Sequence, residues 1–230
     1  MNDKAPDFRA TVRHVEKIGR RYAVIEAQTS DEFRHKPGQF TKVSFTDQEG
    51  SFDRFYSIAS APTGDGRFEL CLILDDERLR RIVESWSKDS SFTCSLPGGR
   101  FPIPAQQRSI VCIAGGSGIT PLRAIIQDRV NQGVKAPTVL LYGCQSDDEI
   151  PFYSSFATWQ NDHRNFKLVV YADETPLGRA LRGRPLNHLQ KHVVPDADYL
   201  LCGPPGFMDS ARRLLEDFGI AKDAIHQDRF

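Results

Sequence analysis

Hydrophobic residues in the first part of the chain lie in short segments that alternate with turn residues. Such segments run over 10–18, 22–28, 39–45, 54–60, 67–74 and 90–96. Aromatic and β-branched residues in runs of this length, separated by turns such as the Pro-Thr-Gly-Asp-Gly at 62–66, are typical of β-strands. Several strands spaced this closely predict a barrel or a sandwich.

One segment of this first part has helical spacing instead. Leu79, Ile82, Val83 and Trp86 recur at intervals of three and four residues. This spacing predicts a single amphipathic helix over 77–87. An aspartate at position 75 or 76 is expected to cap its N-terminus.

From residue 108 the pattern changes. Uninterrupted apolar segments at 109–114, 138–144, 166–172 and 198–203 alternate with helical patterns at 121–132, 150–160, 186–193 and 205–219. Strands that are apolar on both faces and alternate with helices predict a parallel sheet covered on both sides. The Pro- and Gly-rich segment 97–107 is the expected join, and we expect domains at 1–104 and 105–230.

Composition and charge narrow the range of functions. Thirty basic and thirty acidic residues in 230 give a pI near 7.0, which does not favour nucleic acid or a membrane surface as partner. No apolar run approaches the ~20 residues of a membrane helix, and the polar start lacks the apolar core of a signal peptide. The five cysteines form no C-x-x-C pair, so we expect no metal site and a reduced, cytoplasmic protein.

Three glycines follow the first strand of the second half. Gly115, Gly116 and Gly118 lie between a strand and a helix, with Thr120 as the expected N-cap and Pro121 at the first helical position. Glycines let a ligand approach the backbone closely, and a helix N-terminus attracts negative charge. The segment therefore predicts a diphosphate cradle, with a tight turn that binds nothing as the alternative. It is not the standard Rossmann fingerprint, because a proline replaces the third glycine and no acidic residue closes the next strand.

The last apolar strand ends in Cys202, Gly203 and Pro204, and a helix follows. Ligands of open parallel sheets bind outside the carboxyl ends of the strands. We therefore expect Cys202 and the glycine turn to face the same site. A buried cysteine that only fills space is the alternative.

Three motifs occur in order along the chain: R-F-Y-S at 54–57, G-G-S-G-I-T-P at 115–121 and C-G-P-P-G-F-M at 202–208. Together they resemble the ferredoxin–NADP reductase superfamily of flavin- and nicotinamide-dependent reductases, here without an iron–sulfur domain. The resemblance covers nearly the whole chain. It implies an N-terminal antiparallel Greek-key β-barrel that binds flavin, followed by a C-terminal α/β parallel-sheet domain that binds NAD(P).

The resemblance also implies roles for individual residues. Arg54 would pair with a flavin phosphate, Tyr56 would lie against the flavin and Ser57 would hydrogen-bond near its N5. Cys202 would lie near the nicotinamide C4. The resemblance thus implies three catalytic residues: Ser57, Cys202 and Phe230. The expected cofactor-binding residues are Arg54, Phe55, Tyr56, Ser57, Leu72, Ile73, Leu74, Gly115, Gly116, Ser117, Gly118, Ile119, Thr120, Pro121, Gln145, Cys202, Gly203, Pro204, Met208 and Phe230.

Phe230 is the last residue of the sequence. The resemblance implies that its ring shields the flavin and moves aside when nicotinamide stacks there. An ordinary aromatic residue of a last strand, or a frayed end, is the alternative.

The sequence departs from the family at the expected flavin diphosphate site. Most FAD-binding relatives have a Gly-x-x-Ser or Gly-x-x-Thr segment there, whereas this chain has three acidic residues at 75–77. These carboxylates would repel a diphosphate, and Arg78, Arg80 and Arg81 could offset them. We expect FAD as the cofactor, with FMN as the alternative.

A second departure concerns the nicotinamide nucleotide. Gln145 stands where relatives often have an arginine, which leaves NADH and NADPH both open. Arg179, Arg182 and Arg184 could reach a 2′-phosphate or be solvated, whereas Asp173 would suit a free ribose diol.

The expected function is an oxidoreductase that moves electrons from NADH or NADPH through a bound flavin to a separate one-electron carrier. The carrier would be a ferredoxin, a flavodoxin or an oxygenase component, and Arg100 with the basic residues at 78–81 could meet an acidic partner. One alternative is a flavin reductase that uses a diffusing flavin. Another is a non-catalytic, nucleotide-binding redox subunit.

Overall fold

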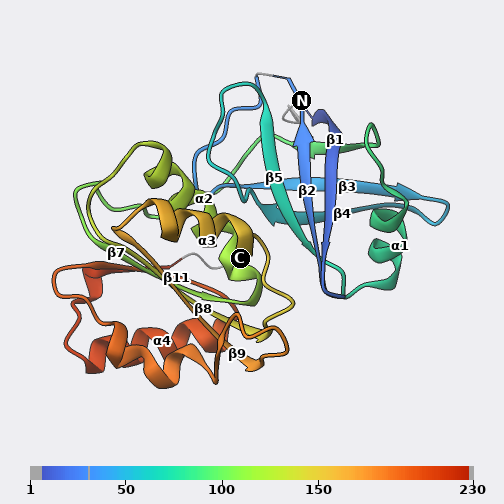
Figure 1. Cartoon of the computed structure of the whole chain (residues 1–230). Coiled ribbons are helices and arrows are strands. Elements are labelled where there is room, and N and C mark those ends of the chain that lie inside the picture. The colour runs from blue at the N-terminus through green and yellow to red at the C-terminus, as the bar shows by residue number, and fades with distance from the viewer. Residues whose placement is uncertain (1–6, 31, 228–230) are drawn as a thin grey trace. The chain divides into compact units, whose positions relative to one another are not determined.

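The computed structural model describes residues 7–30 and 32–227 of the chain. The chain divides into two compact units, Met1–Arg100 and Phe101–Phe230 (Figure 1). In the part of the chain that the structure describes, no helix is long and apolar enough to cross a membrane.

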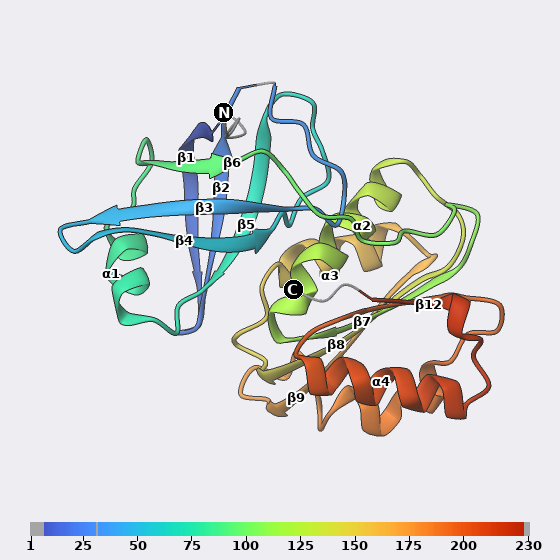
Figure 2. The ribbon, with the colours of Figure 1, turned by 180° about the vertical axis from the view of Figure 1, so that it is seen from behind.

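The first unit is built on a six-stranded antiparallel sheet in the order β4-β3-β6-β1-β2-β5 (Figure 2). Its strands are β1 (Asp7–Ile18), β2 (Tyr22–Gln28), β3 (Phe40–Asp47), β4 (Gly50–Ser57), β5 (Arg67–Ile73) and β6 (Ser91–Ser95). The last strand in the sequence, β6, lies between β1 and β3, which is a Greek-key arrangement.

The chain beyond β4 brings the two edges of this sheet together. Ile58 forms a bridge with Leu70 of β5, and the Ala59 N–H donates to the Glu69 carbonyl at 2.7 Å. The sheet therefore curls toward a barrel, which confirms the predicted antiparallel fold of the first half.

Alternating side chains from the curled sheet fill its core. Val43 and Phe45 of β3 are buried, as the alternation of the strand requires. The Trp86 ring stacks on Phe45 at 5.7 Å and on Phe92 at 5.2 Å. These aromatic contacts attach the chain beyond α1 (Glu77–Ser85) to the sheet.

The helix α1 begins where the sequence predicts it. Asp76 is its N-cap, and its side chain accepts hydrogen bonds from the backbone N–H groups of Arg78 and Leu79. Leu79 and Val83 are buried on the face toward the sheet. Of the two aspartates expected to cap this helix, the structure selects Asp76.

The second unit contains a six-stranded parallel sheet in the order β10-β9-β8-β7-β11-β12. Helices α2 and α3 cover one face and α4 the other (Figures 1 and 2), which confirms the predicted α/β fold. The strands are β7 (Ile110–Gly115), β8 (Thr138–Ser146), β9 (Phe166–Glu174), β10 (Leu181–Arg182), β11 (Asp198–Cys202) and β12 (Ile225–Gln227). The helices are α2 (Ile119–Asn131), α3 (Tyr153–Asp162) and α4 (Pro205–Asp217), with short 3₁₀ helices η1 (Gly116–Gly118), η2 (Pro185–His192) and η3 (Lys222–Ala224).

Two of the predicted helices differ from the structure. The segment at 186–193 is the 3₁₀ helix η2, and the chain becomes extended at Val193, two residues before Pro195. Helix α3 begins three residues later than expected, since Phe152 has a left-handed backbone with φ of 61°. The buried Phe152 ring lies under the Arg123 guanidinium at 4.2 Å, and this packing holds the unusual conformation.

Asp198 joins three strand ends at the amino-terminal edge of the parallel sheet. Its carboxylate accepts a hydrogen bond from Arg108 at 2.7 Å and pairs with His226 of β12 at 2.8 Å. Burial raises the pKa of this carboxyl, but the bonds from His226 and Arg108 outweigh it and hold the pKa below its ordinary value of 3.8. This cluster explains how the short strand β12 is fixed to the sheet.

We predict that Asp198→Asn lowers the free energy of unfolding by roughly 2 kcal/mol near neutral pH, because it removes an ionic acceptor shared by two donors. A carboxyl with a depressed folded pKa stabilises the fold above its unfolded pKa, and this contribution disappears as the pH falls through the folded value. The wild-type and variant stabilities should therefore converge in urea unfolding at low pH. Asp162→Asn, an exposed position at the end of α3, is the control. Equal stabilities near neutral pH would contradict the prediction.

Candidate functional site

The R-F-Y-S segment forms the end of β4 and presents different groups on its two faces. Tyr56 points toward the core, where its ring meets Phe45 edge-on at 6.2 Å, and burial raises its pKa. Phe55 and Ser57 alternate with it on the other face. The Phe55 ring is 65% exposed and meets Phe40 edge-on, so a large aromatic surface faces solvent beside the Ser57 hydroxyl.

The residues at the end of β5 that are expected to bind flavin lie mainly in the core of the first unit. The Leu72 and Leu74 side chains are buried in the core of the first unit, and Ile73 is half-buried. The Leu74 carbonyl accepts a hydrogen bond from Arg80 at 2.5 Å. The two leucine side chains therefore belong to the core rather than to a ligand surface.

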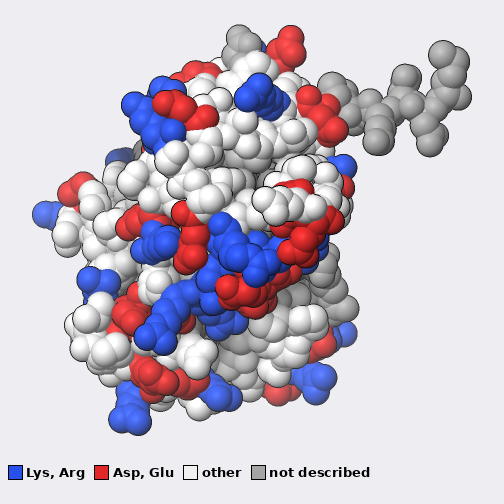
Figure 3. Space-filling model, turned by 90° about the vertical axis from the view of Figure 1, so that its right-hand side faces the viewer, with Lys and Arg blue, Asp and Glu red and all other residues white. Residues whose placement is uncertain are grey.

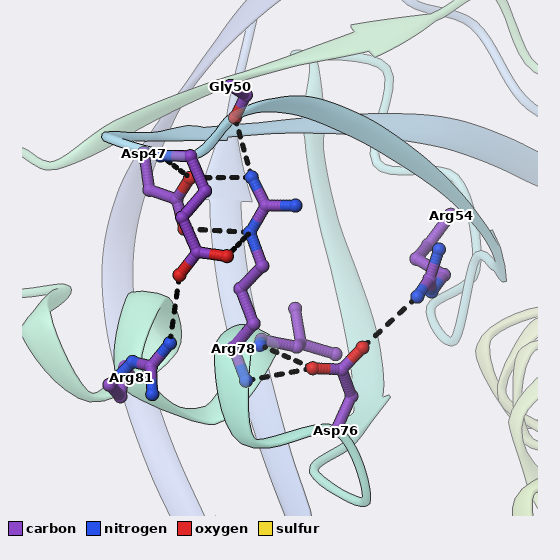
Figure 4. Close-up of polar contacts among 8 residues, drawn as sticks. Asp47, Gly50, Arg54, Asp76, Arg78 and Arg81 are labelled. Carbon is purple, nitrogen blue, oxygen red and sulfur yellow. Dashed lines mark hydrogen bonds and ion pairs between the residues drawn. The ribbon is translucent and has the colours of Figure 1, made fainter.

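Arg54 contacts a carboxylate of the chain itself. Its guanidinium Nη2 lies 3.2 Å from Oδ2 of Asp76, whose Oδ1 accepts from the N–H groups of Leu79 and Arg78 (Figure 4). These backbone bonds and the Arg54 charge lower the Asp76 pKa, against a smaller opposing effect of burial. The sequence showed the acidic residues but not that one of them binds both Arg54 and the helix.

The arginines of α1 also contact acceptors of the chain. Arg78 makes a bidentate pair with Asp47, at 2.6 and 2.8 Å, and donates to the Gly50 carbonyl. Arg81 pairs with Glu49 at 3.2 Å, and Arg80 with Glu77 at 3.3 Å. Because Asp76 binds the Arg78 and Leu79 N–H groups and the three arginines bind acceptors of the chain, a diphosphate at the first turn of α1 would have to displace these contacts.

The glycine turn of the second unit follows β7 directly. Gly116 has a left-handed backbone, with φ of 55°, and opens the 3₁₀ helix η1, from which α2 continues. The structure shows no side-chain cap on either helix start. The expected cap Thr120 is wrong: it lies inside α2, and its hydroxyl donates to the Ser117 carbonyl at 2.8 Å.

Other residues of the G-G-S-G-I-T-P segment fix the turn. Ile119, Thr120 and Pro121 are buried in the first turn of α2. Ser117 is half-buried. The N–H groups at the start of this turn have no earlier helical turn to bind, so they can serve an anionic ligand.

The end of β11 packs directly on the glycine turn. Cys202 pairs with Ala114 in the parallel register, and a Cβ at Gly118 would collide with the Cys202 carbonyl. A Cβ at Gly203 would lie 3.1 Å from the Gly115 carbonyl oxygen, and the Phe207 ring covers both glycines. The structure therefore brings the second and third motifs together at the point where the strand order reverses, the usual ligand position in such sheets.

The side chains around this junction differ in their access to solvent. Cys202 is 2% exposed, and Met208 is buried in the core between the sheet and α4. Pro204 is exposed just before α4. A ligand at the junction would thus meet the half-buried Phe207 ring together with backbone groups of the glycine turn.

Gln145 and the basic residues at 179–184 lie at the carboxyl ends of β8 and β9. Gln145 is exposed near the end of β8. Arg184 pairs with Asp173 at 3.4 Å, Arg182 is exposed in β10, and the Arg179 guanidinium lies 5.0 Å from the centre of the Tyr153 ring. Phe230 lies outside the described residues.

Sequence reasoning missed two buried charged residues near these loops. Asp147 is fully buried and accepts from the backbone N–H groups of Leu177 and Arg179, at 2.9 and 2.6 Å, so it anchors the loop after β9. Arg123 of α2 is 3% exposed and lies against the Phe152 and Trp159 rings. The acidic run at 147–149 was a visible signal, whereas Arg123 had none.

Comparison with known proteins supports this organisation. Residues 112–213 match the family model of the oxidoreductase NAD-binding domain. The chain is 25% identical, over 86% of its length, to terephthalate 1,2-dioxygenase reductase component 1 of Comamonas sp, and 27% identical, over 87%, to the ferredoxin reductase component of 3-ketosteroid-9-alpha-monooxygenase of Mycolicibacterium smegmatis. It spans 60% and 57% of the lengths of these two relatives.

Solved structures share the fold over nearly the whole chain. The flavohem-like FAD/NAD binding domain of nitric oxide dioxygenase from Vibrio cholerae matches with a TM-score of 0.86 and 22% identity, covering 99% of both chains. A ferredoxin NADP+ reductase from Neisseria gonorrhoeae with bound FAD and NADP matches with a TM-score of 0.83 and 17% identity, over 98% of this chain and 99% of that one.

The curled antiparallel sheet, followed by a parallel sheet with a glycine turn at its switch point, is the two-domain fold of these solved structures, and its second unit contains the match to the oxidoreductase NAD-binding domain.

We predict that Gly118→Ala lowers the free energy of unfolding of the second unit by roughly 2 kcal/mol or more, because the new methyl group would collide with backbone at Cys202. Differential scanning calorimetry measures this change. Gly206→Ala in α4 is the control, since a Cβ there meets nothing within 4 Å, and it should be neutral or slightly stabilising. If Gly118→Ala is as stable as the wild type, the two motifs do not pack as described.

Proposed function

We propose that this chain is a reductase that takes a hydride from NADH or NADPH onto a flavin, FAD by preference, and passes the electrons singly to a separate redox protein. The carrier is a ferredoxin, a flavodoxin or the oxygenase component of a multi-protein system. The proposal rests most on the packing of the glycine turn against Cys202 in a domain that matches the oxidoreductase NAD-binding model. The names of the two relatives, both reductase components of oxygenases, support the electron acceptor.

The second unit supplies the nucleotide site in this proposal. The N–H groups at 116–118 donate to the nucleotide diphosphate, and the left-handed Gly116 keeps them turned toward it. Gly203 has no side chain because the Phe207 ring lies beside it: a Cβ there would be 2.9 Å from that ring. Cys202, fixed by its pairing with Ala114, bounds the nicotinamide end of the site.

The first unit supplies the flavin site. When bound, a flavin contributes the ability to accept a hydride and release electrons one at a time. The Ser57 hydroxyl would donate a hydrogen bond to the ring, and the exposed Phe55 ring would offer aromatic surface on the same face, whereas Tyr56 points toward the core. Burial raises the pKa of Tyr56. Its hydroxyl is uncharged at neutral pH, as that of an ordinary tyrosine is.

The surface around α1 bears on the choice of protein partner. Figure 3 shows positive and negative side chains intermixed on this face. Arg80 and Arg81 each pair with a glutamate, so the helix presents both signs of charge rather than a basic patch. A partner that docks here would therefore need charges of both signs that complement those around α1. Salt concentration would then have a modest effect on the association rate.

A second candidate function is a flavin reductase that uses flavin as a diffusing substrate. The observation that favours it is the engagement of Arg54 and of the first turn of α1 by Asp76, which leaves the diphosphate without its usual donors. Gel filtration of protein saturated with FAD separates the two functions. A retained yellow chromophore supports the bound-cofactor reductase, and its complete loss supports the flavin reductase.

Anaerobic mixing of the flavin-loaded protein with NADH, and separately with NADPH, tests the proposed function. We predict that at least one nucleotide bleaches the flavin absorbance, and that Ser57→Ala slows this step by roughly tenfold to a hundredfold through loss of a hydrogen bond to the reacting ring. Ser51→Ala, an exposed serine of the same strand, is the matched control and should leave the rate unchanged.

Two results would contradict the proposal. One is a flavin that neither nucleotide reduces, although dithionite reduces it fully. The other is an equal rate of flavin reduction in Ser57→Ala and the wild type. This result would contradict the proposed role of Ser57, but not the proposed class of enzyme.

A further inference from the structure

One carboxylate, Asp76, binds two groups that suit a phosphate. Its Oδ1 accepts the first-turn N–H groups of Arg78 and Leu79 at 2.8 and 3.2 Å, and its Oδ2 lies 3.2 Å from the Arg54 guanidinium (Figure 4). Helix N-terminal N–H groups and a guanidinium are the usual donors to a bound phosphate. In this chain the Asp76 carboxylate already binds both the first-turn N–H groups and the guanidinium.

The Arg54–Asp76 pair leaves little room for a second anion. The Arg54 guanidinium also donates to the Asp53 carbonyl at 3.2 Å and lies 5.0 Å from the centre of the Phe52 ring. An incoming phosphate would therefore have to displace Asp76, or stand beside it and be repelled. Exposed Asp75 adds a further negative charge next to it.

The neighbouring cationic side chains already form ion pairs with other carboxylates of the chain. Arg78 is held by Asp47 and the Gly50 carbonyl and lies over the Phe52 ring at 4.5 Å. The hydrogen bond from Arg78 holds the pKa of Asp47 below its ordinary value. Arg81 pairs with Glu49, and Lys42 with Asp53 at 3.2 Å. Each of these three cations would have to leave its partner to serve a phosphate at the first turn of α1.

We propose that Asp76 is a specificity-determining residue of the flavin site, whose carboxylate takes the place of a flavin diphosphate on Arg54 and on the first turn of α1. The inference deepens the proposed function and rests on it. The chain then holds FAD mainly through its ring system, and the adenosine diphosphate part adds little affinity. FAD and riboflavin, which share that ring system, should bind with dissociation constants within about tenfold of each other.

Asp76→Ser is the decisive variant. Serine is also a good N-cap, so the helix keeps a side-chain acceptor while the negative charge is removed and Arg54 is released. One or two charge-assisted bonds to the diphosphate then become available, and FAD should bind roughly ten to a hundred times more tightly. Riboflavin, which lacks phosphate, should bind as it does to the wild type.

Equilibrium dialysis of FAD and of riboflavin against the flavin-free chain measures both constants. Asp75→Ser is the matched control: it removes a neighbouring charge that neither caps α1 nor pairs with Arg54, so it should leave the ratio of the two constants close to that of the wild type. Thermal unfolding without flavin checks that each variant is folded. If Asp76→Ser fails to fold, Asp76→Asn and the wild-type ratio decide the question.

The outcomes separate the inference from the function on which it rests. A wild-type preference for FAD over riboflavin far above tenfold, or an unchanged ratio in Asp76→Ser, overturns the role of Asp76 while leaving a flavin enzyme. If neither FAD nor riboflavin binds to the wild type or to any folded variant, the proposed function is overturned. The role of Asp76 is then overturned as well.

Discussion

The contact of Asp76 with three donors, two backbone N–H groups of α1 and the Arg54 guanidinium, is the interaction on which the first unit depends. It starts α1, whose buried Leu79 and Val83 complete the core of the curled sheet, and it ties that helix to Arg54 on β4. A single carboxylate thus links the fold to the surface where the flavin is expected. A capping residue is worth about 1 kcal/mol to a helix, so the chain gains stability from the same group that competes with a phosphate.

The second unit meets a different constraint, the close approach of two backbones. Parallel pairing of β7 with β11 places the glycine turn beside Cys202, and only a residue without Cβ fits at position 118. The glycines therefore serve packing as much as ligand approach. This rigid junction gives the N–H groups at 116–118 a fixed direction, which is what a nucleotide site requires.

Much of this organisation could be predicted from the sequence, because periodicity reports burial. The strands on both sides of residue 100, the helix α1 and the meeting of the second and third motifs follow from local patterns and from the rules of parallel sheets. The predicted N-cap of α2 was wrong, since the chain passes first through the 3₁₀ helix η1, and Thr120 lies inside α2 with its hydroxyl bonded to the Ser117 carbonyl. The pairing of Arg54 with Asp76 could not be read from spacing, because the two residues lie 22 positions apart and meet only through the fold.

A crystal structure of the chain with FAD tests the central claim most directly. The account predicts that Asp76 still caps α1 and still contacts Arg54, with the diphosphate lying away from the first turn of the helix. Diphosphate oxygens bound to Arg54 and to the N–H groups of Arg78 and Leu79, with the Asp76 carboxylate turned away, would contradict it.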